Sequence, residues 1–232
     1  MIRPLLVLRP EPGNAATCAA ALAAGLEPVA APLFAIAPRD WAPPPPDSYD
    51  ALLIGSANAL RHGGAGLAAL AGQPALCVGE ATAAAARAAG LEVALVGRGG
   101  LQGLLHEAGH RWPRLLRLAG EAHVPLVAPA GVSITTRIVY AAQPLPLPTA
   151  IARLATTAAL PGLVAALHSA EAARHFAAEC DRLALPRQRI ACALIGPRLR
   201  FALGPGWAAV DTASTPDDAA LLALAAQLCN KP

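Results

Sequence analysis

Four positions place a polar or glycine residue where an apolar, strand-like run gives way to a helical pattern. They are Ser56-Ala57, Gly79 with Thr82, Ser169-Ala170 and Gly196. The first N–H groups of a helix have no partner within the helix, and they bind carboxylates and phosphates well. An N-cap role explains each serine taken alone. The four together predict an anion-binding site at the carboxyl edges of parallel strands.

Few side chains near these positions could transfer a proton. Tyr140 lies at the end of the segment Ile134–Val139, and its hydroxyl can donate a proton. Packing of the ring with its hydroxyl in water is the alternative interpretation. Arg9 ends the first apolar run and carries a positive charge suited to an anion. No GxSxG motif surrounds either serine, which argues against a hydrolase triad.

Two motifs with known chemistry lack their supporting residues. His106-Glu-Ala-Gly-His110 matches HExxH, but Gly109 and Pro113 oppose a continuous helix and no third zinc ligand follows at a suitable spacing. Gly97-Arg-Gly-Gly-Leu-Gln-Gly103 misses GxGxxG by one position, and no acidic residue follows where a ribose would bind. We therefore expect no metal and no nucleotide cofactor.

The composition of the 232 residues excludes several classes of protein. Hydrophobic residues make up 55% and charged residues 14%, which excludes a disordered chain. The net charge of +3 comes without a basic run, so no nucleic-acid footprint is present, although the balance suits a small anionic ligand. Five cysteines without a CxxC pair indicate reduced thiols. The longest uncharged run contains Pro161-Gly162, and Arg9 interrupts the first apolar run, so we expect a cytoplasmic protein without a membrane span.

Short apolar runs alternate with alanine-rich helical stretches along the chain. This alternation predicts parallel α/β sheets covered on both faces. The expected strands are Leu5–Leu8, Ala51–Ile54, Ala75–Val78, Val93–Val96, Leu115–Leu118, Leu163–Leu167, Ile190–Ile195 and Ala208–Val210. The expected helices are Asn14–Ala24, Ala57–Leu70, Glu80–Ala89, one from Leu101, Ala170–Arg182, one after Ile195, and Pro216–Leu228.

A short internal repeat and two proline-rich stretches predict two related halves. Ser56-Ala-Asn-Ala-Leu-Arg-His62 matches Ser169-Ala-Glu-Ala-Ala-Arg-His175 at five of seven positions, each copy after an apolar run. Pro43–Pro46 and Pro144-Leu-Pro-Leu-Pro148 cannot continue helices or central strands. They are either surface loops or strands that cross between two lobes.

Taken in order, several motifs make the chain resemble the uroporphyrinogen-III synthase family. The resemblance covers nearly the whole chain. Its motifs are Leu5–Pro10, Tyr49-Asp-Ala-Leu-Leu-Ile-Gly-Ser-Ala-Asn-Ala59, Cys77-Val-Gly-Glu-Ala-Thr-Ala83, Leu116-Arg-Leu-Ala-Gly-Glu121, Ile138-Val-Tyr140, Ala165–Ser169, Leu194-Ile-Gly-Pro197 and Ser214-Thr-Pro-Asp217.

The resemblance implies two similar flavodoxin-like lobes, each a parallel sheet flanked by helices, joined by a two-stranded linker. Residues 1–36 with 146–232 would form the outer lobe, and residues 37–145 the inserted lobe with the linker strands at its ends. The implied reaction is a cyclising lyase reaction without metal or cofactor. Hydroxymethylbilane, a linear tetrapyrrole with eight carboxylates, loses water and closes with inversion of ring D in the interlobe cleft. The alternative is a bilobal small-anion binding protein without catalysis.

The same resemblance assigns roles to individual residues. Tyr140 would give a proton to the leaving hydroxyl. Arg9 and the four strand-end positions, Ser56-Ala57, Gly79 with Thr82, Ser169-Ala170 and Gly196, would hold the acetate and propionate arms. We expect the protein to be a monomer.

The chain departs from the family pattern at three places. Gly55 stands before Ser56 where the family has threonine, and Arg198-Leu-Arg200 stands where threonines often follow Gly196-Pro197. Residues 120–131 are fewer than usual and include Pro125 and Pro129, so we expect the helix there to be short or absent.

Overall fold

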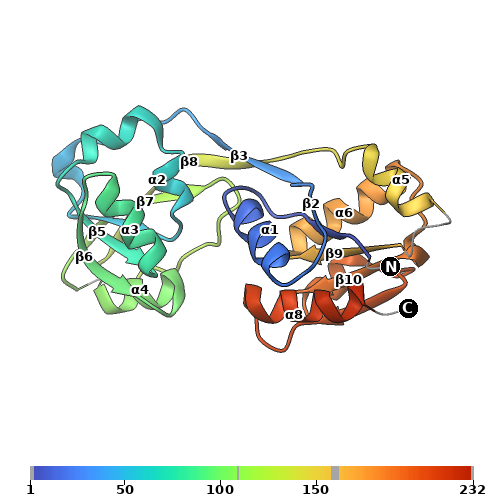
Figure 1. Ribbon diagram of the computed structural model, residues 1–232. Helices are drawn as coiled ribbons and strands as arrows, with labels where there is room; N and C mark the ends of the chain where they lie inside the picture. The colour runs from blue at the N-terminus through green and yellow to red at the C-terminus, as the bar shows by residue number, and fades with distance from the viewer. Residues whose placement is uncertain (1–2, 109, 158–161, 231–232) are drawn as a thin grey trace. The chain divides into compact units, whose positions relative to one another are not determined.

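The computed structural model describes residues 3–108, 110–157 and 162–230. The chain divides into two compact units, one formed by two separate chain segments and one formed by a single segment (Figure 1). The discontinuous unit comprises Met1–Ala35 and Pro144–Pro232, and the continuous unit comprises Ile36–Gln143. The boundaries fall within β3 (Phe34–Pro38) and at the end of β8 (Ser133–Pro144). Pro144–Pro148 therefore begins at a boundary, whereas Pro43–Pro46 lies inside the continuous unit.

The continuous unit is built on a six-stranded sheet in the order β3-β8-β7-β4-β5-β6. The pairings from β8 to β6 are all parallel. The remaining strands are β4 (Ala51–Ile54), β5 (Pro74–Val78), β6 (Glu92–Gly97) and β7 (Arg114–Gly120). Its helices are α2 (Asn58–Arg61), α3 (Glu80–Ala88) and α4 (Gly100–Ala108), with 3₁₀ turns at Pro46–Ser48 and Gly64–Leu70.

Alternation along the strands gives this sheet two apolar faces. Leu52, Ile54, Leu116 and Leu118 pack with α2 and α3 in one core cluster. Ala51, Leu53 and Leu115 point to the other face, where they pack with Leu104, Leu105 and Ala108 of α4. The helix α4 therefore covers the face opposite to α2 and α3.

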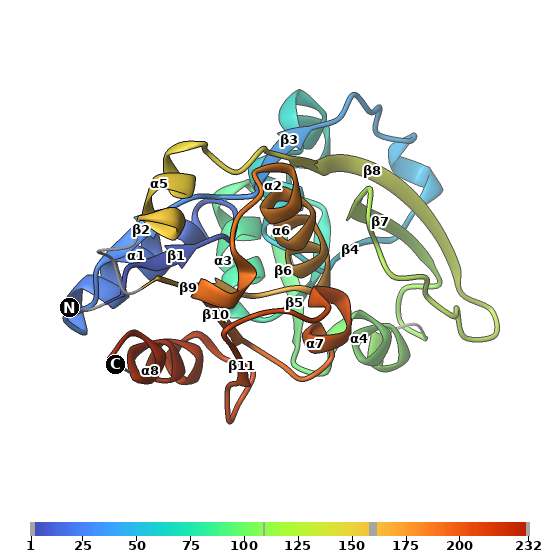
Figure 2. The same ribbon diagram turned by 90° about the vertical axis from the view of Figure 1, so that its right-hand side faces the viewer.

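The discontinuous unit is built on a five-stranded parallel sheet in the order β11-β10-β9-β1-β2. Its strands are β1 (Leu5–Val7), β2 (Pro28–Ala30), β9 (Leu163–Leu167), β10 (Ile190–Leu194) and β11 (Ala209–Thr212). Its helices are α1 (Gly13–Ala23), α5 (Ala150–Thr156), α6 (Ala170–Arg182), α7 (Leu199–Leu203) and α8 (Asp218–Cys229), with a 3₁₀ turn at Arg187–Arg189. Figure 2 shows α6 and α8 on opposite sides of β9 and β10.

The two sheets share one order of strands. If β4, β5, β6, β7 and β8 are matched in turn with β9, β10, β11, β1 and β2, these five strands have the same spatial order in both sheets, and only β3 has no counterpart. The repeated segments Ser56–His62 and Ser169–His175 follow the matched strands β4 and β9. The expected α/β class, with parallel sheets flanked by helices, is confirmed.

The structure corrects several expected elements. The helix expected over Ala57–Leu70 is interrupted: α2 ends at Arg61, Gly64 has φ +62°, which does not continue an α-helix, and Gly64–Leu70 forms the 3₁₀ turn. The strands β2 and β3 and the helix α5 were not expected. Residues 121–132 contain no helix, as the shortened segment predicted. Within the described residues, no helix is long and apolar enough to span a membrane.

Candidate functional site

A pocket of about 430 Å³ opens in the continuous unit, where β4 and β7 end. Ser56 and Tyr140, two of the predicted site residues, both line it. The other lining residues come from the end of β4, from the β6–α4 turn and the first turn of α4, from β7 and from the loop that follows β7. They are Gly55, Gly99, Gly100, Leu101, Gln102, Arg117, Leu118, Ala119, Gly120, Ala122, His123, Val124, Pro125 and Leu126. The first turn of α4 thus contributes directly to the wall.

Two glycines give this pocket its shape, because neighbouring side chains occupy the space of a Cβ atom. A Cβ on Gly55 would lie 2.1 Å from Cδ1 of Leu101. Any larger residue at position 55 would therefore require the Leu101 side chain to move. A Cβ on Gly120 would lie 2.6 Å from Cζ of Tyr140 and 2.9 Å from its hydroxyl oxygen. The tyrosine ring therefore rests against the backbone at the end of β7.

Tyr140 reaches this position through an irregularity in the pairing of β7 with β8. The register shifts after Ala119, so that Gly120 pairs with Tyr140 while Val139 is buried in the core. The Tyr140 carbonyl oxygen accepts a hydrogen bond from the N–H of Glu121 at 2.9 Å. The Tyr140 side chain is half-buried and lines the pocket, and its hydroxyl has no hydrogen-bond partner among the residues described. It is free to bond to a ligand.

The loop 121–132 forms one wall of the pocket and is tied to α4. The Gln102 side chain donates to the Val127 carbonyl oxygen at 2.9 Å and accepts from the Val127 N–H at 3.0 Å. His123 bonds through Nδ1 to the Gly120 carbonyl oxygen at 2.9 Å. Val124 and Val127 remain 76% and 75% exposed. Hydrogen bonds, together with the packing of Leu126 and Val132 against the α4 side of the core, therefore hold this wall.

The strand-end positions of the continuous unit lie on the adjacent strands β4 and β5. The Ser56 hydroxyl accepts from the Asn58 N–H at 3.2 Å, and the following α2 has four residues. Gly79 precedes α3 with φ +75°, a conformation that favours glycine. Thr82 is buried in α3, outside the pocket. The structure thus brings Ser56, but not Thr82, to the same pocket as Tyr140.

In the discontinuous unit the corresponding positions follow the adjacent strands β9 and β10. Ser169 caps α6, since its hydroxyl accepts from the Ala172 N–H at 3.1 Å, and Ala170 is the first residue of that helix. Gly196 lies between β10 and the five-residue α7, and a Cβ there would meet open space. Arg200 donates to the Val210 carbonyl oxygen, so its guanidinium is already engaged.

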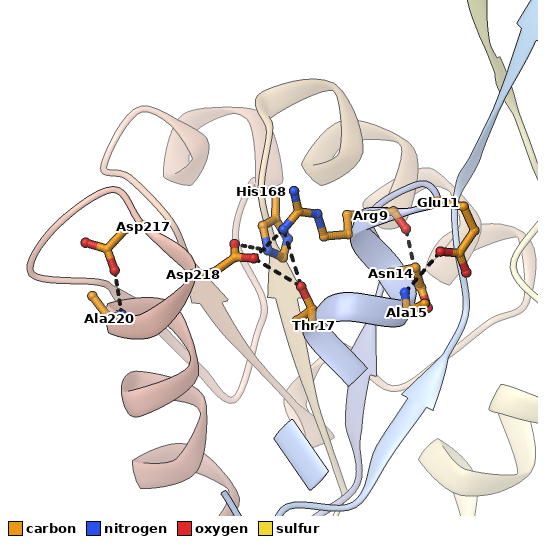
Figure 3. A network of polar contacts seen from close by, with 9 residues as sticks. All are labelled: Arg9, Glu11, Asn14, Ala15, Thr17, His168, Asp217, Asp218 and Ala220. Atoms are coloured by element: carbon orange, nitrogen blue, oxygen red, sulfur yellow. Dashed lines mark hydrogen bonds and ion pairs between the residues drawn. The ribbon is translucent and has the colours of Figure 1, made fainter. Parts of the chain in front are cut away.

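Arg9 belongs to a network of polar side chains at the carboxyl edge of β1 and β9 (Figure 3). Its guanidinium pairs with Asp218 at the start of α8 and donates to the Thr17 hydroxyl at 3.3 Å. His168 Nε2 lies 3.1 Å from the other Asp218 oxygen. Burial first, and then the positive charge of Arg9, lower the pKa of His168. Arg9 is thus partly neutralised by its own chain, which the sequence patterns did not indicate.

The residues of the HExxH motif do not meet as ligands. The helix α4 ends at Ala108, Gly109 lies outside the described residues, and His106 Nδ1 lies 2.7 Å from the Gln102 carbonyl oxygen. No group of three or more metal-ligating side chains occurs among the described residues. The glycine-rich segment 97–103 forms the β6–α4 turn, and its Gly99 and Gly100 line the pocket.

Comparisons with known proteins gave one family model and several similar structures. The model of the family "Uroporphyrinogen-III synthase HemD" matches residues 16–223. The fold is similar to that of the uroporphyrinogen-III synthetase of Helicobacter pylori, with a TM-score of 0.63 at 17% identity over 98% of this chain and 100% of the other. A mutant uroporphyrinogen III synthase of Thermus thermophilus gives a TM-score of 0.50 at 18% identity over 98% and 100%. A search of curated proteins found no match.

The two kinds of comparison carry different weight. The structural likenesses, at these identities, establish a shared fold. The family model spans most of the chain and includes Ser56, Tyr140 and the whole pocket wall between them. The chain therefore belongs to the uroporphyrinogen-III synthase family, an enzyme family of cyclising lyases in haem biosynthesis.

Proposed function

We propose that this chain converts hydroxymethylbilane into uroporphyrinogen III, with Tyr140 as the proton donor to the leaving hydroxyl. A pyrrole nitrogen lone pair expels that hydroxyl, the C–O bond breaks, and the oxygen leaves as water with the donated proton. The resulting azafulvene is attacked by the substituted carbon of ring D, through a spiro intermediate. The observation that supports this assignment is the Tyr140 hydroxyl, which lines the pocket without a hydrogen-bond partner in the described chain.

Most of the catalytic task on this proposal is orientation. The linear tetrapyrrole closes unaided to a different isomer, so the protein must fold the substrate before it provides acid or base. We propose that Ser56-Ala57, Gly79 and Thr82 of one lobe, and Arg9, Ser169-Ala170 and Gly196 of the other, hold the carboxylate arms. Thr82 and Arg9 are the weakest candidates for substrate binding in this set, because Thr82 is buried and Arg9 is paired with Asp218.

The finer architecture is part of the same proposal. The outer lobe of residues 1–36 and 146–232 and the inserted lobe of 37–145, joined by two linker strands, would bind the substrate between them. The shared strand order of the two sheets supports two related lobes. We further propose a cytoplasmic monomer that needs no cofactor.

An isomer assay tests the proposal. Purified protein is supplied with enzymatically generated hydroxymethylbilane, and the oxidised products are separated as uroporphyrin isomers. We expect isomer III to predominate over the spontaneous isomer I. If only isomer I forms, at the rate seen without protein, the proposed activity is refuted and the alternative, a small-anion binding protein, is left.

Tyr140→Phe isolates the hydroxyl. The ring keeps its packing on Gly120, so we expect an unchanged unfolding temperature and a turnover lowered by roughly 10²-fold, a typical contribution of one general acid. Thermal unfolding and the isomer assay measure the two quantities. Unchanged turnover would remove Tyr140 from the reaction and leave the isomer specificity to be explained by binding alone.

A further inference from the structure

Arg117 is a buried cation inside the apolar part of β7 that runs from Leu115 to Ala119. It occupies β7 between Leu116 and Leu118, and it is 5% exposed. Strand alternation places it on the same face as Leu115, which packs against α4. Arg117 also lines the pocket that holds Ser56 and Tyr140. Its guanidinium therefore belongs to the wall of the candidate site rather than to the protein surface.

No carboxylate within the described chain balances this charge. Nη2 of Arg117 donates to the Val124 carbonyl oxygen at 2.9 Å, and Nε has no partner. Nearby acidic side chains are engaged elsewhere, since Asp50 pairs with Arg114 and Glu121 with Arg39. None of the residues that line the pocket is acidic.

An isolated buried cation is unfavourable, because burial removes its hydration without supplying an opposite charge. Burial accordingly lowers the pKa of Arg117. A carboxylate in the pocket would supply the opposite charge that the guanidinium lacks, and a charge-assisted hydrogen bond from an N–H group to a carboxylate is among the stronger hydrogen bonds in proteins. The first turn of α4, at Gly100–Gln102, lines the same pocket and favours an anion.

We propose that Arg117 binds one carboxylate arm of the tetrapyrrole in this pocket. The inference rests on the proposed function, since it takes the substrate to be the polycarboxylate of that reaction. It adds a binding residue that lies in the middle of a strand rather than at a strand end. If Arg117 binds one carboxylate arm, the pyrrole ring that carries this arm would lie in the pocket that the Tyr140 hydroxyl also lines.

A purely structural role is the competing explanation, because Arg117 also tethers the loop 121–132 through Val124. Gln102→Leu provides a comparison for that role. It removes two hydrogen bonds between α4 and Val127 of the same loop and leaves the positive charge in place. Arg111→Met provides the charge control, because Arg111 is exposed and stacks on Trp112, outside the pocket.

The experiment measures KM and kcat for hydroxymethylbilane at two salt concentrations with the full-length variants. Loss of a charge-assisted contact predicts that Arg117→Met raises KM by roughly 10- to 100-fold. We expect a smaller rise in KM for Arg117→Lys, which keeps the positive charge but loses the planar pair of N–H donors. For Arg111→Met we expect a KM within about twofold of wild type. Arg117→Met should also reduce the dependence of kcat/KM on salt, whereas Gln102→Leu should preserve it.

The outcomes separate the two hypotheses. If wild type yields only isomer I, the proposed function fails before Arg117 is tested. If wild type yields isomer III and Arg117→Met keeps the wild-type KM, the inference is wrong. Equal changes of KM in Arg117→Met and Gln102→Leu, with equal salt dependence, would also overturn it in favour of loop tethering. Should Arg117→Met not fold, Arg117→Lys decides alone, since an unchanged KM overturns the proposal and a raised KM at an unchanged unfolding temperature supports it.

Discussion

Gly120→Ala tests whether turnover depends on the exact position of the Tyr140 ring. The backbone of Gly120 accepts alanine, because its φ does not lie in the left-handed region, so the effect arises from the added methyl group. That Cβ would lie 2.6 Å from Cζ of Tyr140, whereas ordinary contacts begin at 3.4 Å. The difference, 3.4 − 2.6, requires the ring to move by about 0.8 Å.

This movement should affect turnover more than stability. The ring is half-buried and can shift toward solvent, so we expect a loss of about 1 kcal/mol, at the lower end of overpacking costs. That loss corresponds to a fall of roughly 2–4 °C in unfolding temperature. A misplacement of about 1 Å in a reacting group can slow catalysis by roughly 10²-fold. We therefore expect Gly120→Ala to fold and to lose most of its isomer III activity.

Turnover in the isomer assay and thermal unfolding are measured for both single variants and for Gly120→Ala combined with Tyr140→Phe. If the methyl group acts by displacing the hydroxyl, the double variant is no slower than Tyr140→Phe alone. Gly103→Ala is the control, because its Cβ meets nothing within 4 Å in the exposed middle of α4, where alanine stabilises a helix. Undiminished turnover in Gly120→Ala, or an equal fold-loss in both backgrounds, would refute the reasoning.

Two further predictions concern a helix cap and an ion pair. Ser169→Ala removes the cap of α6 and should cost about 1 kcal/mol in thermal unfolding, whereas Ser169→Asp keeps a capping oxygen and should unfold like wild type. If Ser169 holds a carboxylate arm, the added negative charge of Ser169→Asp raises KM, and an unchanged KM would place the arm elsewhere. Hydrogen bonds from Arg114 lower the pKa of Asp50 below its ordinary value of 3.8, so the pair stabilises the fold above that value and loses its effect as the pH falls through the lowered pKa. Asp50→Asn should therefore be less stable than wild type by up to about 1 kcal/mol near neutral pH, and the gap should close in strong acid; a gap that is independent of pH would contradict this.

The strands that the sequence predicts best are those buried on both sides. Ala51–Ile54 and Leu163–Leu167 are fully buried, and an uninterrupted apolar run is the expected pattern for such strands. The strand β2 escaped prediction because it has three residues, begins with proline and is partly exposed at the end of its sheet. Alanine and proline in an edge strand give almost no periodic signal.

Individual residues of the candidate site could be predicted from the sequence, but not which of them share one pocket. Ser56 follows an apolar strand and Tyr140 follows Ile138-Val139, yet their shared pocket depends on the register shift beside Ala119. Arg117 had a usable signal, a charge inside the buried run 115–118, but it was not among the predicted residues. The partner of Arg9 was beyond sequence reasoning, because Asp218 lies 209 residues away.

The interrupted course of the discontinuous unit bears on how the chain folds as it is synthesised. The strand β1 pairs on one side with β2 and on the other with β9, and β9 follows the whole of the continuous unit. Translation proceeds from the N-terminus, so residues 36–143 can close their own sheet while β1 still lacks its second neighbour. The strand β1 therefore gains its second neighbour only after residues 36–143 have been synthesised, and β10 and β11 extend the sheet later still.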